Sequence, residues 1–244
     1  MQRYFLNRLI DDKIILTSDQ DIFKHFGKVM RARIGSKAEF VDSNQSVFVG
    51  EVDSVSNDII SIKVVSKINT NSELPIEVTI VVSPLKNDRS DWLIQKATEL
   101  GVNHIIMADM KRTVVDWHKQ LAKKQARFEK IAKSAAEQSH RLMIPSIEFV
   151  NWQTVCNMKK DTGIVAWEES AKAGEKLAFV TQITDQDLKH LVLVFGPEGG
   201  LTTEELEILE SNGYIAAGLG PRILRAETAP LYALSAISTL CELS

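Results

Sequence analysis

Short alternations of apolar and polar residues fill roughly the first quarter of the chain. A period of two is typical of strands that bury one face, and turn residues such as Asn44 and Gly50 fall near the breaks. The alternating runs are Arg3–Leu6, Lys37–Val41, Ser46–Val52 and Ile59–Val65, and a helical stretch at Gln20–Met30 interrupts them. We therefore predict a small β-rich barrel or sandwich over residues 1–72, ended by a polar linker at Lys67–Glu73.

After Pro75 the pattern changes to strands of the fully buried type that alternate with helices. The predicted strands are Val78–Val82, His104–Ala108, Ile147–Val150, Gly163–Trp167, Leu191–Phe195 and Tyr214–Leu219. The predicted helices are Asp91–Leu100, Trp117–Gln138, Thr202–Ser211 and Ala229–Leu243. Thr202, with Glu205 three residues on, has the pattern of a capping box. Alternating strands and helices indicate an α/β domain over residues 75–244, with a mostly parallel sheet covered on both faces.

The composition excludes several classes of protein. Hydrophobic residues make up 44% of the chain and charged residues 25%, which is ordinary for a globular protein with a sizeable core. The longest run without Asp, Glu, Lys or Arg is Thr228–Cys241, which is too short to span a bilayer. The amino terminus lacks a signal-peptide pattern, and Cys156 and Cys241 stand outside any CxxC or Cys/His cluster. We expect a cytoplasmic protein with no membrane segment and no metal site.

Two basic stretches stand out in a chain whose net charge is −3. The first, Asp21–Lys37, carries five lysines and arginines against a single acidic residue, and the second is Lys111–Arg141. Local cationic stretches in an acidic protein are typical of nucleic-acid contacts, but they also occur on solvated helix faces. Charge alone does not decide between these interpretations.

Glycines point to a ligand site near the carboxyl terminus. Six of the 12 glycines lie between Gly196 and Gly220, in the loops FGPEGG (195–200) and GLGPR (218–222) and just before the second loop. Each loop follows an apolar strand, and ligands of open α/β sheets bind at the carboxyl ends of strands. Glycines there let the backbone approach a ligand and present N–H groups to it. Two tight turns without a ligand are the alternative.

The sequences of the two loops also limit the kinds of ligand that the site could bind. Neither has the spacing of a dinucleotide fingerprint or a P-loop, and no lysine is placed for a triphosphate. Backbone polar groups, with apolar neighbours at Leu193, Leu219, Ile223 and Leu224, suit a neutral or cationic nucleoside better than a polyphosphate.

Charged residues crowd the otherwise apolar segment PRILRAETAP (221–230) beside the second loop. One interpretation is the start of a helix, with Thr228 as its cap, Pro230 near its first turn and the charges in solvent. The other is a site in which Arg225 steadies an anion beside the Glu227 carboxylate.

FGPEGG, followed by LGPRILRAETAPLYAL (219–234), resembles the carboxyl-terminal signature of the bacterial 16S ribosomal RNA uridine N3-methyltransferases, the RsmE family. That family belongs to the SPOUT class of knotted, S-adenosylmethionine-dependent methyltransferases. Upstream matches are DWLIQKATELGV (91–102), RTV (112–114), AAEQSHR (135–141) and HFGKVMR (25–31). The resemblance covers nearly the whole chain, and the pairing of the two carboxyl-terminal motifs is specific.

The resemblance implies a fold, a cofactor and partners. Residues 1–72 are expected to form a PUA-like β-barrel that helps to hold RNA, and residues 75–244 a SPOUT α/β domain with a deep trefoil knot. The expected cofactor is S-adenosylmethionine, and the expected substrate is one specific uridine of 16S rRNA in the small ribosomal subunit. A homodimer is expected to complete each site, and the nearly uncharged helix Ala229–Leu243 favours the same assembly.

Two other functions stay open at this point. One is a SPOUT enzyme with another RNA target, such as a ribose 2′-hydroxyl of transfer RNA. The other is a non-catalytic ribosome-binding or assembly factor that retained the fold.

The motif matches also assign the site. Arg225 is expected to stabilise negative charge on O2 and O4 of uracil, and Glu227 to accept the N3 proton, with Glu198 as the rival carboxylate. His25 and Phe26 are candidates to stack on a splayed base, although Phe26 also suits a packed core. The cofactor pocket is assigned to Leu193, Gly196, Gly199, Gly200, Leu219, Gly220, Ile223, Leu224, Thr228 and Ala229. RNA contacts are assigned to Lys24, His25, Lys28, Arg31, Arg33, Arg112 and Arg141.

Overall fold

Separate groups of buried apolar side chains divide the chain into two units, each with its own sheet. The computed structural model describes residues 1–168 and 178–243. Unit 1 comprises Met1–Ser72 and Ala136–Met143, and unit 2 comprises Glu73–Ala135 and Ile144–Ser244.

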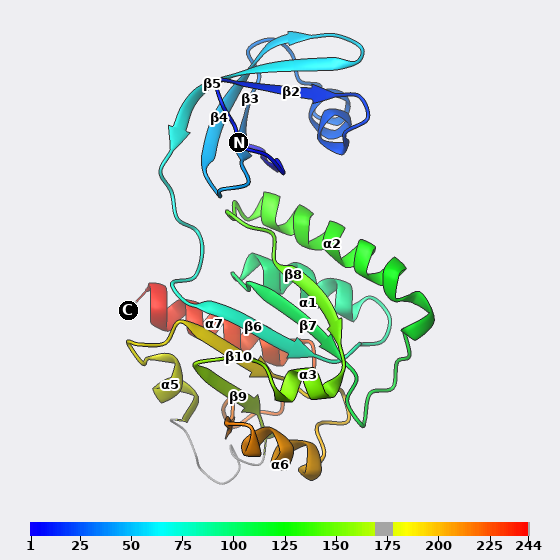
Figure 1. Ribbon diagram of the computed structural model, residues 1–244, viewed down its shortest axis with the longest axis vertical. Coiled ribbons are helices and arrows are strands. Elements are labelled where there is room, and N and C mark those ends of the chain that lie inside the picture. Colours follow the sequence, from blue (N-terminus) through cyan, green and yellow to red (C-terminus); the bar gives the residue numbers. More distant parts are fainter. Residues whose placement is uncertain (169–177, 244) are drawn as a thin grey trace. The chain divides into compact units, whose positions relative to one another are not determined.

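Unit 1 is built on a five-stranded sheet in which most neighbouring strands are antiparallel (Figure 1). Its strands are β1 (Arg3–Phe5), β2 (Lys13–Thr17), β3 (Lys37–Val41), β4 (Val47–Val55) and β5 (Ile59–Ile68), in the order β1-β3-β4-β5-β2. Strand β1 runs parallel to β3. Four of these strands confirm the alternating pattern. The pattern missed β2, because Ile14, Ile15 and Leu16 follow one another without alternation.

Helix η1 (Phe23–Val29) is a π-helix inside the stretch that the sequence predicts as helical. The N–H of Met30 donates to the carbonyl of His25 at 2.9 Å, five residues earlier, which is the spacing of a π-helix. Gly27 lets the helix lie close to the sheet, because a Cβ there would come within 2.8 Å of Cδ1 of Ile60.

Aromatic side chains meet in the core of unit 1. The ring of Phe26 lies 5.6 Å from that of Tyr4 and 6.3 Å from that of Phe40, measured between centroids. Phe26 is therefore a packed core residue, and stacking on a base is ruled out for it. Burial raises the pKa of the Tyr4 hydroxyl well above its usual range, and that hydroxyl shares a hydrogen bond with Nδ1 of His25 at 2.9 Å. Tyr4 thus fixes the ring of the exposed His25.

A buried ion pair ties the segment Ala136–Met143 into unit 1. Nε of Arg3 donates to Oε2 of Glu39 at 2.8 Å, and Nη1 donates to the carbonyls of His140 and Arg141. Nδ1 of His140 lies 3.0 Å from the same Glu39 oxygen. The sequence alone assigns this segment to the second domain, because nothing local signals a partner 137 positions away.

Unit 2 is an α/β domain whose six strands are all parallel (Figure 1). The strands are β6 (Glu77–Val82), β7 (His104–Ala108), β8 (Ser146–Val150), β9 (Thr162–Ala166), β10 (His190–Val194) and β11 (Tyr214–Ala217), in the order β11-β9-β10-β6-β7-β8. The helices are α1 (Arg89–Glu99), η2 (His118–Gln120), α2 (Leu121–Gln138), α3 (Trp152–Cys156), α5 (Ala178–Ile183), α6 (Thr203–Ser211) and α7 (Thr228–Glu242). The predicted parallel sheet, its strands and the four long helices are confirmed.

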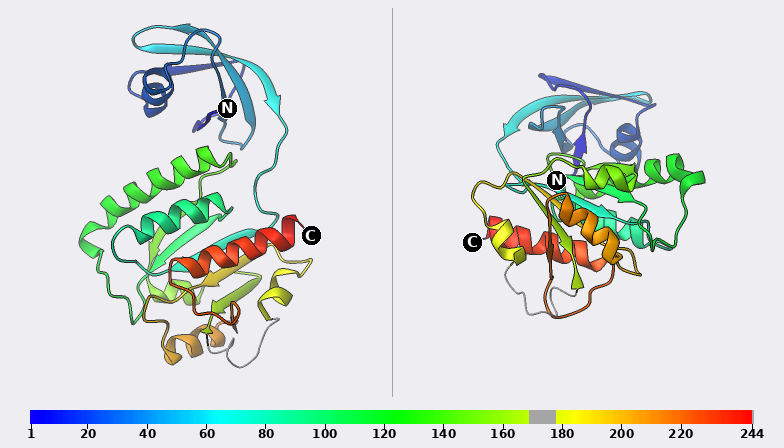
Figure 2. Two further views of the ribbon diagram at one scale, coloured as in Figure 1. Left: turned by 180° about the vertical axis from the view of Figure 1, so that it is seen from behind. Right: turned by 60° about the horizontal axis from the view of Figure 1, so that its bottom comes forward.

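Helices cover both faces of this sheet (Figure 2). One face packs against α1, α2, α5 and α7 through side chains such as Leu93, Phe128 and Leu234. The other face packs against α3 and α6 through Val155 and Leu206. Helices α3 and α5 span only five and six residues, too few to show a helical period in the sequence. Within the described residues, no helix combines the length and apolar character that a membrane span requires.

The parallel alignment brings three connections to one edge of the sheet. Strand β9 pairs with β10 on one side and with β11 on the other, and all three run in the same direction. Residues 166–168, 195–201 and 218–227, which follow these strands, therefore lie together at their carboxyl ends.

Candidate active site

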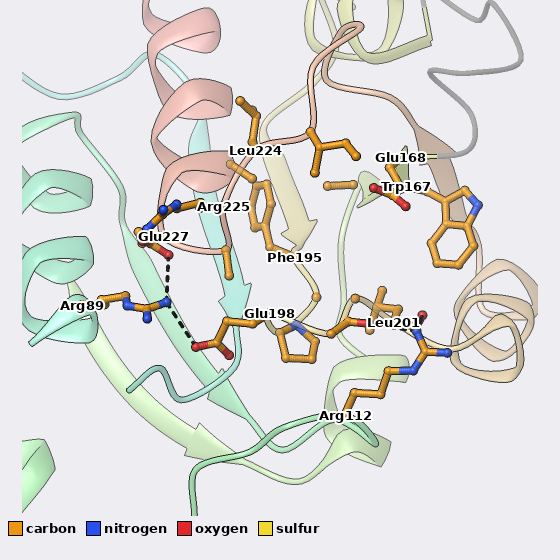
Figure 3. A pocket seen from close by; sticks show the side chains of 18 of the residues that line it. Arg89, Arg112, Trp167, Glu168, Phe195, Glu198, Leu201, Leu224, Arg225 and Glu227 are labelled. Carbon is orange, nitrogen blue, oxygen red and sulfur yellow. Dashed lines mark hydrogen bonds and ion pairs between the residues drawn. The ribbon is translucent and has the colours of Figure 1, made fainter. Parts of the chain in front are cut away.

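A pocket of about 740 Å³ lies between the three connections, and a smaller one of about 240 Å³ adjoins it (Figure 3). The two share residues from the connections after β9 and β11, among them Trp167, Leu224 and Ala229. Together they form one site with a larger and a smaller compartment, of the size that small-molecule ligands occupy.

The glycine loop after β10 forms one wall of the larger compartment. Gly196 has no room for a side chain, since a Cβ there would lie 2.8 Å from the backbone N of Leu201. The N–H of Gly200 donates to the carbonyl of Pro197 at 2.8 Å, which closes the turn. The predicted capping box at Thr202 is confirmed and begins α6 directly after the loop.

Arg112 holds this glycine loop from outside. Its Nη1 donates to the carbonyl of Gly199 at 2.8 Å and to that of Leu201 at 3.2 Å. One residue earlier, the N–H of Lys111 donates to the buried Oε1 of Glu205 at 2.7 Å. The sequence analysis assigns Arg112 to RNA contacts, whereas the structure shows its guanidinium bound to the loop and lining the pocket.

The connection after β11 forms the smaller compartment. It contributes Leu219 to Leu224, and Gly220 adopts a φ of +98°, a conformation that favours glycine. Across from it stand Trp167 and Glu168, which follow β9. Trp167 and Glu168 were not predicted as site residues, although Trp167 ends a predicted buried strand and Glu168 directly follows it.

Charged side chains cluster at one side of the larger compartment, away from Trp167 (Figure 3). Nη1 of Arg89 lies 3.5 Å from Oε1 of Glu198 and 3.9 Å from Oε2 of Glu227. Nη1 of the exposed Arg225 lies 4.0 Å from the other oxygen of Glu227. Glu227 is buried, and its Oε2 has no hydrogen-bond partner among the described residues. The wall of the pocket therefore includes a residue whose buried carboxylate oxygen has capacity to accept a hydrogen bond.

Most residues that the sequence assigns to the cofactor and the chemistry line this site. They are Gly196, Gly199, Gly200, Leu219, Gly220, Ile223, Leu224, Arg225, Glu227 and Ala229. Leu193 does not, because its side chain is buried in the core of unit 2. Thr228 is not among the lining residues either, and it does not cap α7: the N-cap is Glu227, with no capping hydrogen bond from its side chain. Arg89 was missed, since a charge at the start of a helix usually signals only solvation.

The residues assigned to RNA contacts divide into two groups. Lys24, His25, Lys28, Arg31 and Arg33 are exposed on unit 1, on η1 and the segment after it. Arg141 is only 1% exposed, so its guanidinium cannot reach an RNA phosphate in this structure. Its backbone carbonyl accepts a hydrogen bond from Nη1 of Arg3 at 3.2 Å.

Comparison with known proteins identifies the class of protein to which the chain belongs. Residues 72–238 match the RNA methyltransferase domain family. Over its full length the chain is 42% identical to the ribosomal RNA small subunit methyltransferase E of Bacillus subtilis, 98% of which is covered. The chain belongs to this small subunit methyltransferase E family.

Two solved structures agree with this assignment. The family member from Neisseria gonorrhoeae bound to S-adenosylmethionine is 27% identical, with a TM-score of 0.84 and 98% of each chain covered. A putative methyltransferase from Legionella pneumophila, in complex with the same cofactor, is 26% identical, with a TM-score of 0.84 over 97% of this chain and 96% of that one.

Replacing Arg112 with alanine is expected to loosen the glycine loop. The variant loses both hydrogen bonds to the carbonyls of Gly199 and Leu201. At about 1 kcal/mol for each bond, hydrogen–deuterium exchange of residues 195–202 should speed up roughly tenfold or more. Arg127→Ala, which removes an exposed bond to Asp91, is the control and should leave that exchange unchanged. Wild-type exchange in the Arg112 variant would show that this residue does not position the loop.

Proposed function

We propose that the chain transfers a methyl group from S-adenosylmethionine to N3 of one specific uridine in the RNA of the small ribosomal subunit. The observation that carries the proposal is a pocket in which two glycine loops meet the buried carboxylate of Glu227, whose Oε2 has no hydrogen-bond partner among the described residues. Family membership supports an RNA methyltransferase that acts on the small subunit. Uridine N3 as the target rests on the motif resemblance and on the chemistry of Glu227.

The pocket fits a nucleoside cofactor. The smaller compartment offers apolar and aromatic walls at Trp167, Leu219 and Leu224, and the tight turn at Gly196 keeps the larger wall free of side-chain bulk. The two relatives with bound S-adenosylmethionine support the same ligand here. When bound, it supplies a methyl group already activated by a sulfonium. The residues of the chain must then align the target nitrogen with that methyl and remove the proton from the nitrogen.

Glu227 is suited to remove the proton. Uracil N3 carries hydrogen and is a poor nucleophile until that hydrogen leaves. Glu227 lines the larger compartment, and a rotation of its buried carboxylate would let an N3–H group there donate to Oε2, which would then accept the proton. Negative charge develops on O2 and O4 as the proton leaves. Arg225 and Arg89, which flank Glu227, supply the positive charge that stabilises it.

Affinity for RNA is assigned to unit 1. Its exposed lysines and arginines are suited to phosphate contacts, which supply most sequence-independent affinity. The mainly antiparallel sheet supports the PUA-like fold implied by the motifs. For unit 2 we propose the trefoil knot of the SPOUT class, supported by a strand order in which the late strand β11 pairs with β9. A ribosomal substrate also supports a cytoplasmic location.

The reaction is tested directly on small ribosomal subunits from a strain that lacks this protein. Incubation with the purified chain and S-adenosylmethionine should produce N3-methyluridine at one position, detected by mass spectrometry of the digested RNA. Methylation of a ribose or of transfer RNA would contradict the proposal, and so would cofactor binding without any transfer.

Gly196→Ala is expected to weaken cofactor binding. The added Cβ meets the backbone of Leu201 at 2.8 Å, so the loop must open. Calorimetry should show a dissociation constant for S-adenosylmethionine raised about tenfold or more, which corresponds to about 1.4 kcal/mol. Gly213→Ala is the control outside the pocket: alanine is strained at its φ of +80°, although no atom lies within 4 Å of the added Cβ, and the affinity should not change. An unchanged affinity in a folded Gly196 variant would remove the loop from the cofactor site.

Glu227→Gln is expected to slow transfer by about 10²–10⁴, because glutamine keeps the shape but cannot accept the proton. The dissociation constant for S-adenosylmethionine should stay within roughly threefold of the wild-type value, a change in binding free energy well below about 1.4 kcal/mol. Glu198→Gln removes the other carboxylate beside Arg89 and should slow transfer less than about tenfold. If the Glu198 variant is the slower of the two, the rival carboxylate is the proton acceptor.

We also propose that the chain forms a homodimer through α7. Glu242 is the one charged residue of this helix, and Tyr232 is exposed on it although Leu231, Leu234 and Ile237 already face the core. An isologous contact would cover the rest. Light scattering at low micromolar concentration should give twice the chain mass of 27.3 kDa. A monomer with full transferase activity would contradict the dimer.

A further inference from the structure

Large apolar side chains are exposed at the end of η1 and in the segment that follows it. Val29 is 67% exposed, Met30 52% and Ile34 72%, all within six residues. On the same helix Phe23 and Phe26 are buried, so the sequence separates an inward aromatic face from an outward aliphatic one. Single exposed apolar residues need no explanation, but several close together commonly mark a contact surface.

Backbone hydrogen bonds hold this segment in place. The N–H of Ala32 donates to the carbonyl of Phe26 at 3.1 Å, and that of Gly35 donates to the carbonyl of Val52 at 2.9 Å. Arg31, directly after the C-cap Met30, has a φ of +54°, the left-handed conformation in which helices commonly end. The exposed side chains are therefore displayed on a fixed backbone, which lowers the entropy cost of binding.

Cations are interleaved with these apolar side chains. Lys24, Lys28, Arg31 and Arg33 are exposed, and Asp21 forms an ion pair with one of them, its Oδ1 lying 3.8 Å from Nζ of Lys24. Phosphates satisfy the cations, but aliphatic side chains gain nothing from a phosphate. In an A-form duplex the base faces are stacked and the major groove is too narrow for side chains. In unpaired RNA the base faces are open to apolar contact.

We propose that residues 24–34 form a surface that selects unpaired RNA, with Val29, Met30 and Ile34 against base faces and the cations on phosphates. The exposed ring of His25, oriented by the Tyr4 hydroxyl, adds a flat surface for the same bases. This inference rests on the proposed function and deepens it: the enzyme selects the strandedness of its RNA through unit 1, apart from the pocket.

The test measures binding of the full chain to a short oligoribonucleotide without self-complementarity, and to the same strand annealed to its complement. The wild type should bind the single strand more tightly. The triple variant Val29→Ser, Met30→Ser, Ile34→Ser should lose roughly tenfold or more of its single-strand affinity, because it removes the apolar surface that would meet base faces. Its duplex affinity and its salt slope should not change. Arg31→Ala should weaken both and reduce the salt slope by about one per lost phosphate contact.

The control is Val55→Ser, Ile59→Ser, which removes two side chains that are each 45% exposed elsewhere on unit 1. It should bind like the wild type, and all variants should melt like the wild type, because the changed side chains lie outside the core. Equal single-strand affinity of triple variant and wild type would overturn the inference, as would a wild type without strand preference. If the triple variant lost binding to small subunits while its affinity for RNA stayed unchanged, the surface would bind a protein, and the inference would also be overturned. Failure of the proposed function is recognised separately, by a wild type that neither binds RNA nor transfers a methyl group.

Discussion

The buried carboxylate of Glu205 fixes the wall on which the active site depends. Its Oε1 accepts the N–H of Lys111, and its Oε2 accepts the N–H and the hydroxyl of Thr202, at 2.7 to 3.0 Å. A charge withdrawn from water is tolerated only when donors surround it in this way. These bonds join the start of α6 to the connection after β7, and Arg112 adds two more to Gly199 and Leu201. The glycine loop is thus held at its end and along its length, and the carbonyls of Pro197, Gly199 and Leu201 accept hydrogen bonds before any ligand arrives.

A fixed loop explains why the chemistry can rest on a few side chains. Arg89 and Glu227 come from α1 and from the end of the connection before α7, so their spacing depends on how these helices pack on one face of the sheet. The Glu227 carboxylate keeps one buried oxygen without a hydrogen bond among the described residues, which would destabilise the fold slightly if nothing bound there. A small loss of folding free energy at one group, in surroundings that are otherwise well hydrogen-bonded, is expected where that group binds a substrate.

The sequence predicted the parts whose signals are local. Buried parallel strands are continuous apolar runs, and glycines gather where the backbone turns tightly at Gly196 and Gly220, so the sheet and the two loops could be located. The parts it missed depend on tertiary contacts. Arg141 reads as a surface cation until the bond from Arg3 shows that its segment belongs to unit 1. Arg89 reads as the solvated start of a helix, and only packing reveals the two carboxylates beside it. Helical periodicity likewise did not distinguish the π-helix η1 from an α-helix, since the difference lies in one extra residue per turn.

Separate cores in the two units permit a division of the binding energy. Methylation at N3 requires a uridine that is unstacked and unpaired, and extruding a base costs a few kcal/mol. Phosphate contacts cannot offset that cost selectively, because they are the same for paired and unpaired strands. An apolar surface on unit 1 that prefers unpaired bases offsets this cost selectively, because it binds the disrupted RNA and not the duplex. The pocket of unit 2 then needs to recognise one base that is already free, and its few charged groups can be devoted to the proton and the developing charge.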